Sequence, residues 1–159
     1  MSEIIMIAAV SKNNVIGKNN SIPWHIKEDL QRFRELTLNF PVIMGRKTFE
    51  SLPIKPLPHR TNIVLSKQEN LELQGVIVKQ SLEEAIEYCR GFEKVFIIGG
   101  QNVFEQGMRY AVTLEITRVE KEVEGDAFFP EIKEKEWKLE KEEEKLGYCF
   151  QTYKKITYS

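Results

Sequence analysis

The chain is 159 residues long, with 42% apolar residues and 23 basic against 24 acidic side chains. This length fits one domain, residues 1–159, with its own apolar core, and the even charge balance argues against a dedicated nucleic-acid-binding protein, which would show a basic excess. Apolar runs are far shorter than the ~20 residues that span a bilayer, and the first follows an acidic Glu3, unlike a secretory signal, so we expect a cytoplasmic protein.

The first half of the chain predicts several strands, one loop and one helix. Residues 4–10 are a continuous apolar run, typical of a strand buried on both faces of a mostly parallel sheet. Residues 13–25 are rich in Asn, Gly, Ser and Pro and are expected to form a loop. Residues 27–38 are expected to be a helix, because apolar side chains recur at three-residue steps from Leu30. Further short strands are expected at 42–44, 61–65 and 76–79.

The middle of the chain continues the alternation of helices and strands. Ser81 and Glu84 form a capping box, which predicts a helix that runs to about Arg90. A strand is expected at 95–98, and two glycines then lead into a short helix around 102–106. Strands that alternate with helices place the chain in the α/β class.

The C-terminal third predicts the strands that close the sheet. Apolar and polar residues alternate over 112–116, which indicates a half-buried strand, and a similar alternation over 148–158 predicts an antiparallel pair. The segment 131–145 is ambiguous. Its Glu and Lys content favours a helix, but Trp137 and Leu139 alternate as in a strand, so we favour a strand with a charged, solvated loop.

Cysteines and histidines give little sign of chemistry. Cys89 and Cys149 are far apart and have apolar or aromatic neighbours, so we expect two reduced structural thiols. His25 and His59 lack a Cys or His partner at ligand spacing. We therefore expect no metal site.

Asp29 is the most informative acidic residue. It lies four residues before Phe33 and seven before Leu36, and therefore on the same helical stripe as these apolar side chains. A carboxylate that faces inward is costly unless it is hydrogen-bonded or has a function, which makes Asp29 a candidate catalytic acid. The first turn of a helix also favours negative charge, so a purely structural N-terminal acid is the alternative.

Two strand ends are followed by glycine and the start of a helix, at residues 45–48 and 99–102. Free amides at such turns favour an anion, and Arg46 and Lys47 add positive charge to the first turn. The two glycines of the second turn allow phosphates to approach the backbone, although such a turn is often only a matter of geometry. Together the two turns suggest a ligand with several phosphates at the carboxyl ends of the strands.

Two further residues suggest the walls of a binding site. Trp24 follows Ile22-Pro23 in the polar loop, where a large aromatic side chain suits a site wall better than a core. Arg60 follows a stiff turn at Pro56-Leu57-Pro58 and is a candidate clamp for a carboxylate. Simple packing and a surface arginine are the alternatives.

Taken in order, these motifs resemble dihydrofolate reductases of the bacterial type. The matching segments cover nearly the whole chain: Ile7-Ala8-Ala9-Val10, Val15-Ile16-Gly17, Ile22-Pro23-Trp24, Asp29-Leu30, Pro41-Val42-Ile43-Met44-Gly45-Arg46, Pro56-Leu57-Pro58, Arg60-Thr61-Asn62, Ile98-Gly99-Gly100, and Val123-Glu124-Gly125-Asp126 before Phe129-Pro130. The resemblance implies one eight-stranded, mostly parallel sheet with an antiparallel C-terminal strand and helices on both faces. It also implies NADPH-dependent reduction of dihydrofolate to tetrahydrofolate, supporting one-carbon metabolism and thymidylate synthesis, by a monomer that binds antifolates.

The resemblance assigns roles on the substrate side. Asp29 matches the family's pocket acid, which hydrogen-bonds the pterin and promotes protonation at N5 while a hydride passes to C6. Thr117 matches the partner of this acid, and Trp24 is placed with them among the catalytic residues. Arg60 matches the clamp on the α-carboxylate of the substrate's glutamyl group. The substrate-contacting walls are matched by Ile7, Ala9, Ile22, Leu30, Phe33, Leu52, Leu57 and Ile98.

The resemblance also assigns a cofactor site for NADPH. Arg46, Ser66 and Lys67 match the site of the 2′-phosphate, whereas Lys47, Thr48 and the turn 100–102 match the site of the pyrophosphate. The complete cofactor set is Ala9, Ile16, Gly17, Gly45, Arg46, Lys47, Thr48, Leu65, Ser66, Lys67, Ile98, Gly99, Gly100, Gln101, Asn102, Val103 and Phe104. In this family the peptide between the two glycines is cis, and the loop at 13–25 is a mobile lid braced by the turn at 125–126.

The chain departs from the family pattern at a few positions. Ile22 stands where some members have Met or Leu, and Phe104 replaces a Tyr that many relatives have. His59 occupies a usual glycine position, and Pro53-Ile54-Lys55 replaces a common Gly-Arg pattern, so the departures gather in the turn before Arg60. Two alternatives stay open: a riboflavin-pathway pyrimidine reductase of the same fold, which Asp29 in its Leu-x-x-Phe helix disfavours, and a nucleotide-binding module without turnover.

Overall fold

The computed structural model describes residues 2–17, 26–68 and 70–157. The strands of its main sheet are β1 (Glu3–Ser11), β3 (Pro41–Gly45), β4 (Thr61–Leu65), β5 (Ile77–Lys79), β6 (Lys94–Gly99), β7 (Thr113–Val119), β9 (Trp137–Glu144) and β10 (Tyr148–Lys155). The helices are α1 (Lys27–Thr37), α2 (Arg46–Ser51), α3 (Leu82–Tyr88) and α4 (Gln101–Gly107). A separate pair is formed by β2 (Val15–Gly17) and β8 (Ala127–Phe128).

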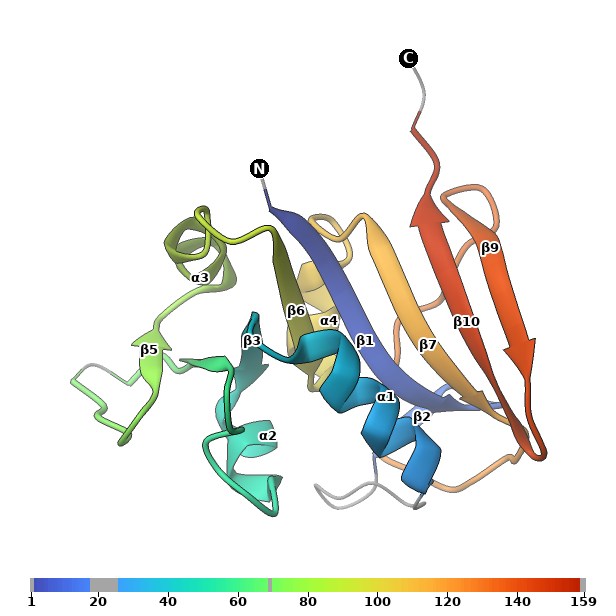
Figure 1. The fold of residues 1–159 in the computed structure, drawn as a ribbon, viewed down its shortest axis with the longest axis horizontal. Coiled ribbons are helices and arrows are strands. Elements are labelled where there is room, and N and C mark those ends of the chain that lie inside the picture. The colour runs from blue at the N-terminus through green and yellow to red at the C-terminus, as the bar shows by residue number, and fades with distance from the viewer. Residues whose placement is uncertain (1, 18–25, 69, 158–159) are drawn as a thin grey trace.

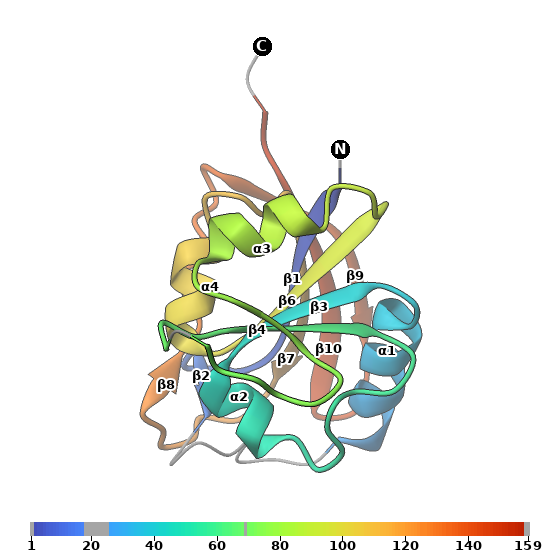
Figure 2. The same ribbon diagram turned by 90° about the vertical axis from the view of Figure 1, so that its left-hand side faces the viewer.

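Within these residues, eight strands form the main sheet in the order β5-β4-β3-β6-β1-β7-β10-β9. Neighbours pair in parallel except at β10, which is antiparallel to both β7 and β9. Helix α1 lies on one face and helices α3 and α4 lie on the other (Figures 1 and 2). The predicted mostly parallel sheet, its antiparallel C-terminal strand and helices on both faces are therefore confirmed.

The central strand β1 contributes to an apolar cluster on each face of the sheet. Ile5 and Ile7 pack on the α1 face, whereas Ile4, Met6 and Val10 pack on the face of α3 and α4. All five side chains are buried. The continuous apolar run at 4–10 thus reflects burial on both faces, as the sequence predicts.

The sheet opens beside the carboxyl end of β1. Pairing between β1 and β6 ends at Met6 and Ile97, whereas pairing between β1 and β7 continues to Ser11 and Val119. The last residues of β1 and β6 are therefore not tied to each other by a ladder of hydrogen bonds. In open α/β sheets, ligands bind outside the carboxyl ends of strands at such a separation.

Two features of the fold differ from the predictions. Strand β2 lies inside the region expected to be a loop, and it forms because β8, more than a hundred residues later, pairs with Val15 and Gly17. Strand β7 is buried on both faces rather than one, because α1 covers one face through Asp29 and Arg32 and the apolar cluster of α3 and α4 covers the other. Its Thr113 and Thr117 are buried as well as Leu114 and Ile116.

The ambiguous region 131–145 contains no helix. Strand β9 begins at the buried Trp137 and follows a turn that is rich in charge, which confirms the predicted strand with a charged loop. Strand β9 is the outer edge of the sheet, and its remaining side chains are exposed and mostly charged. Charged edge strands discourage pairing with a second chain.

The cap of α3 and the thiols follow expectation. The Ser81 hydroxyl accepts a hydrogen bond from the Glu84 amide at 3.1 Å, although the Glu84 carboxylate binds the amide of Gln80 rather than that of Ser81. Cys89 and Cys149 are free and buried, and burial raises the pKa of Cys89 to about 11. Among the described residues, no helix is long and apolar enough to cross a membrane.

Candidate active site

Asp29 lies in the first turn of α1 and faces the sheet. Its carboxylate accepts a hydrogen bond of 2.5 Å from the hydroxyl of Thr117, 88 residues further along the chain. Thr117 is on β7 and pairs with Ala9 at the carboxyl end of β1. The inward orientation predicted from the helical stripe is therefore confirmed. The contact also brings together the predicted acid and its predicted partner.

The surroundings of Asp29 favour its protonated form. Burial raises the pKa of Asp29 above its ordinary value, while the hydrogen bond from Thr117 and the positive charge of Arg32 partly oppose this rise. A buried carboxyl group with a raised pKa keeps its proton to higher pH than an exposed one. The raised pKa suits Asp29 to a role in proton transfer.

Apolar side chains predicted as substrate walls gather on the same face of the sheet as Asp29. Phe33, Leu52, Leu57 and Ile98 pack against one buried cluster, to which Ile7 itself belongs. They come from α1, the segment after α2, β6 and β1, so the cluster is assembled from distant parts of the chain.

Two wall residues stand out by their local geometry. Pairing between β3 and β6 passes from Ile43–Ile97 to Met44–Gly99, so Ile98 is the extra residue of a bulge. Bulges re-aim side chains and are frequent beside active sites. Leu30 is 51% exposed although it is apolar. An exposed leucine next to Asp29 fits a wall that contacts a ligand better than it fits packing.

Arg60 is held in place by its own turn. Its Nε donates to the carbonyl of Pro58 at 2.9 Å, its Nη1 donates to the Thr37 hydroxyl at 3.2 Å, and its guanidinium carbon lies 6.0 Å from the centre of the Phe33 ring. Burial and the nearby charge of Arg34 lower the pKa of Arg60. The predicted clamp therefore borders the apolar wall.

The turn before Arg60, where the sequence departs from the family pattern, is fixed by its backbone conformation and by hydrogen bonds. His59 has a φ of 59°, the left-handed conformation that glycine adopts most easily. Asn62, which is only 2% exposed, binds Leu57 through both its amide nitrogen and its oxygen, and also binds the carbonyl of Arg60. Nothing in the sequence marks Asn62 as a positioning residue, although it lies in one of the matched motifs.

The two glycine-containing turns predicted to bind phosphates are in contact. A Cβ atom added to Gly45 would lie 3.4 Å from Val103 and 4.0 Å from the carbonyl oxygen of Gly99, and one added to Gly100 would lie 3.4 Å from the hydroxyl of Thr48. The Gly99–Gly100 peptide is cis, as the resemblance implies. The turns 45–48 and 99–102 thus form one surface at neighbouring strand ends.

The predicted 2′-phosphate residues come together beside these turns. Arg46 donates to Glu50 and to Gln68, each at 2.9 Å. The amide of Gln68 in turn donates to the Ser66 hydroxyl at 3.2 Å. Lys67 is exposed between them. The end of β3 and the segment after β4 therefore share one cationic surface.

Not every predicted cofactor residue offers its side chain to a ligand. Val103 and Phe104 are buried, and Phe104 packs against Phe129 with a ring-centroid distance of 5.0 Å. Val103 and Phe104 pack beneath the glycine turns, beside Gly45 and Gly99 respectively. Ile16 and Leu65 also pack against the core on that face.

The described part of the lid region is tied to the turn at 125–126, as predicted. The amide of Asp126 donates to the carbonyl of Gly17 at 3.1 Å, and the side-chain amide of Asn13 donates to the carbonyl of Val123 at 2.9 Å. A Cβ atom on Gly125 would lie 2.2 Å from Val15, so only glycine fits there. The predictions for Ile22, Pro23 and Trp24 concern positions outside the described residues.

Fold and site together define a class of protein. One half-buried carboxyl group lies beside apolar walls, and glycine turns with cations lie at the neighbouring strand ends, as in α/β oxidoreductases that use a nicotinamide nucleotide. A sequence model described as dihydrofolate reductase matches residues 3–155. The chain belongs to the dihydrofolate reductase family and is an enzyme of that family.

Individual relatives agree with this assignment. The chain is 50% identical over 138 residues to a dihydrofolate reductase of Neisseria meningitidis serogroup A, covering 87% of this chain and 85% of that one. It is 43% identical over 136 residues to the Bacillus subtilis dihydrofolate reductase, covering 86% and 80%.

A solved structure is also similar. The Enterococcus faecalis dihydrofolate reductase complexed with NADP(H) and RAB-propyl has a TM-score of 0.88 and 33% identity, covering 98% of this chain and 97% of that one. These comparisons favour neither the pyrimidine reductase nor the module without turnover.

Proposed function

We propose that this enzyme reduces dihydrofolate to tetrahydrofolate with NADPH, and that Asp29 promotes the protonation of N5. The observation that carries the role of Asp29 is its position. The carboxyl group is hydrogen-bonded to Thr117, faces the apolar wall, and has a pKa raised by burial. The reaction needs one hydride at C6 and one proton at N5, so a single acid suffices. Apolar walls strengthen its hydrogen bond to a protonated ring.

The side chains around Asp29 have separate tasks. Thr117 fixes the orientation of the carboxyl group and leaves its second oxygen free of this bond. Ile7, Phe33 and Ile98 exclude water from the flat ring of the substrate, while Arg60 supplies a cation for the glutamyl α-carboxylate. This arrangement orients the ring before any proton moves, which is where much of the rate enhancement in such reactions arises.

The residues at the strand ends fit NADPH. A side chain on Gly100 would fill the space beside Thr48, so the backbone itself forms the cradle, and Arg46, Lys47 and Lys67 supply exposed positive charge. We assign Lys47, Thr48 and the turn 100–102 to the pyrophosphate, and Arg46, Ser66 and Lys67 to the 2′-phosphate. When bound, NADPH supplies the hydride, and the protein aligns the two rings and provides the proton.

The assay for this function follows NADPH absorbance after dihydrofolate is added to the purified enzyme. The enzyme is prepared from a host without its own dihydrofolate reductase, because traces of host enzyme would mask low rates. Rapid loss of absorbance with dihydrofolate supports the proposal. Binding of NADPH without turnover, or turnover only with a ribosylated pyrimidine, contradicts it.

We also propose that residues 1–159 form one domain that acts as a cytoplasmic monomer and binds antifolates. One continuous sheet from β5 to β9 supports the single domain, because every strand of it contributes to the same apolar cluster, the one on the face of α3 and α4. The charged edge strand β9 supports the monomer, because it discourages strand pairing between chains. Light scattering at assay concentrations measures the mass directly, and a dimer mass contradicts the proposal.

A further inference from the structure

Arg32 and Glu115 form an ion pair one helical turn from Asp29. The Nη2 of Arg32 lies 3.0 Å from the Oε1 of Glu115, and the two side chains are only 21% and 15% exposed. The hydroxyl of Thr152 donates to the same carboxylate oxygen. Charges so far from water are costly unless they are paired and hydrogen-bonded. The pair is therefore well satisfied, and the residues assigned above to substrate and cofactor do not include it.

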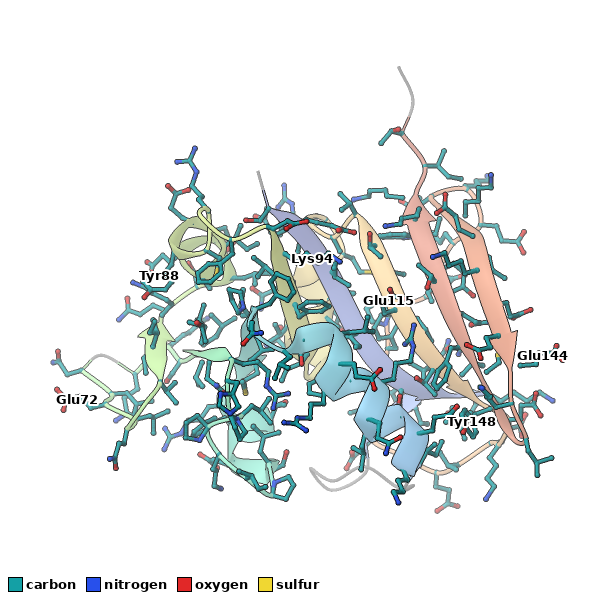
Figure 3. The ribbon with its side chains drawn as sticks, viewed as in Figure 1. Glu72, Tyr88, Lys94, Glu115, Glu144 and Tyr148 are labelled. Atoms are coloured by element: carbon teal, nitrogen blue, oxygen red, sulfur yellow. The ribbon has the colours of Figure 1, made fainter. Side chains whose placement is uncertain are left out.

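The pair and Asp29 contact neighbouring positions of the same strands. Glu115 precedes Thr117 by two residues on β7, so both side chains point to the α1 face. Across the ladder, Thr152 is directly opposite Glu115 and Phe150 is directly opposite Thr117. The guanidinium carbon of Arg32 lies 4.6 Å from the centre of the Phe150 ring. Figure 3 labels Glu115 on β7, one of the strands beside α1.

Two further titratable groups, one from α1 and one from β10, lie near Asp29. Glu28 of α1 and Asp29 both act on Tyr148 of β10, and Figure 3 also labels this tyrosine. Lys145, in the turn before β10, lies 3.5 Å from Glu28 and 2.9 Å from Glu143, so its charge is shared between two glutamates. The positive charge that acts on Asp29 is that of Arg32.

We propose that Arg32 and Glu115 are positioning residues that set the pH range in which Asp29 can promote protonation of the substrate. Arg32 supplies a positive charge that favours the ionised form of Asp29, and Glu115 holds Arg32 in place and offsets part of its charge. The inference rests on the proposed function, because it assigns Asp29 as the acid of that reaction.

The two partners act on Asp29 with opposite sign. Replacing Arg32 by a neutral residue removes a cation and leaves the Glu115 anion, so the ionised form of Asp29 becomes less favourable and its pKa rises. Replacing Glu115 by a neutral residue leaves the Arg32 cation without its counter-charge, so the pKa of Asp29 falls. A loss of structure alone would not shift the pKa in opposite directions for the two substitutions.

The direct test is a carbon-13 NMR titration of the carboxyl group of Asp29 in Arg32→Gln, Glu115→Gln and the unsubstituted enzyme. Both substitutions keep a hydrogen-bonding amide, and Asp29→Asn identifies the signal. We expect a higher pKa in Arg32→Gln, a lower pKa in Glu115→Gln, and a nearly unchanged pKa in Arg32→Lys, which keeps the charge. Glu87→Gln is the matched control and leaves the titration unchanged, because Glu87, near the end of α3, forms an exposed pair with Arg90 beyond the helix.

Single-turnover hydride transfer gives a second readout. If the protonated acid is required, then Arg32→Gln raises the rate at alkaline pH and Glu115→Gln lowers it, each by about three- to tenfold, since an adjacent charge shifts a pKa by roughly one unit or more. Shifts of the Asp29 pKa in the same direction, or no shift, overturn the inference. Opposite shifts in the titration without any dihydrofolate turnover support the pair and contradict only the proposed function.

Discussion

The substrate side and the cofactor side of this enzyme differ in the chemical groups that form them. On the substrate side, a half-buried acid and apolar side chains face the sheet under α1. On the cofactor side, glycine backbone and exposed cations meet at the ends of β3, β4 and β6. Recognising phosphates needs accessible donors and charge, whereas promoting proton transfer needs burial that changes a pKa. Substitutions on the two sides should therefore change different kinetic quantities.

The largest expected effect is on the substrate side. Asp29→Asn should lower turnover of dihydrofolate at neutral pH by ~10²–10⁴, the usual range for a positioned acid or base. This corresponds to roughly 3–5 kcal/mol of activation free energy. Single-turnover rates at saturating NADPH measure it, and the affinity for NADPH serves as the control because it should not change. A near-normal rate for the Asn variant would remove Asp29 from the mechanism.

The next effect belongs to the cofactor side. Arg46→Ala should weaken binding of NADPH by about ten- to hundredfold, since a hydrogen bond to a charged group contributes roughly 1.5–3 kcal/mol. Binding of NADH should change little, because NADH lacks the 2′-phosphate. Fluorescence titrations with both nucleotides measure this, with Arg90→Ala as the matched control from an exposed ion pair. Equal losses for the two nucleotides would place Arg46 elsewhere in the site.

A smaller effect is expected from Thr48, whose hydroxyl lies beside Gly100. Thr48→Val keeps the shape of the side chain but removes one hydrogen-bonding group, which contributes about 1 kcal/mol. The Michaelis constant for NADPH should rise roughly fivefold while kcat stays the same at saturation. A fall in kcat with an unchanged Michaelis constant would contradict the division between the two sides.

The smallest expected effect is on stability, and it has the opposite sign to the effect on activity. The pKa of Asp29 is raised in the folded protein, so the folded state holds this proton more tightly than the unfolded chain. The contribution of Asp29 to the free energy of unfolding is therefore lost as the pH rises from the pKa of Asp29 in the unfolded chain through its pKa in the folded protein. It does not return above that range. Asp29→Asn should gain up to about 1 kcal/mol at neutral pH.

Urea unfolding of Asp29→Asn and the unsubstituted enzyme tests this prediction. The difference between them should shrink as the pH is lowered toward ~4, the ordinary range of an aspartate. Arg46→Ala, by contrast, should change stability by less than about 0.5 kcal/mol, because its partner Glu50 is exposed. A destabilised Asn variant at neutral pH would mean that ionised Asp29 stabilises the fold.

Features that depend on a short segment could be predicted from the sequence on both sides, whereas contacts between separate residues could not. The cofactor turns depend on local features, glycines and cations within four residues of a strand end, and the structure brings the two turns into contact. The inward orientation of the Asp29 side chain could also be predicted, from its spacing to Phe33 and Leu36 along the helix. Asn62, which fixes the turn that carries Arg60, was not recognised because nothing in its neighbourhood shows that it is buried or that it binds Leu57.

The amino-acid sequence by itself determined the α/β class, the continuous burial of β1, the glycine turns and the stripe that carries Asp29, because each depends on periodicity or composition within a short segment. Tertiary structure decided which distant residues meet. Thr117 is hydrogen-bonded to Asp29, Glu115 forms an ion pair with Arg32, and β8 pairs with β2. The burial of β7 on both faces was decided in the same way, by α1 on one face and the apolar cluster of α3 and α4 on the other. Periodicity reports which face of a segment is apolar, whereas the identity of its neighbours depends on the packing of the whole chain.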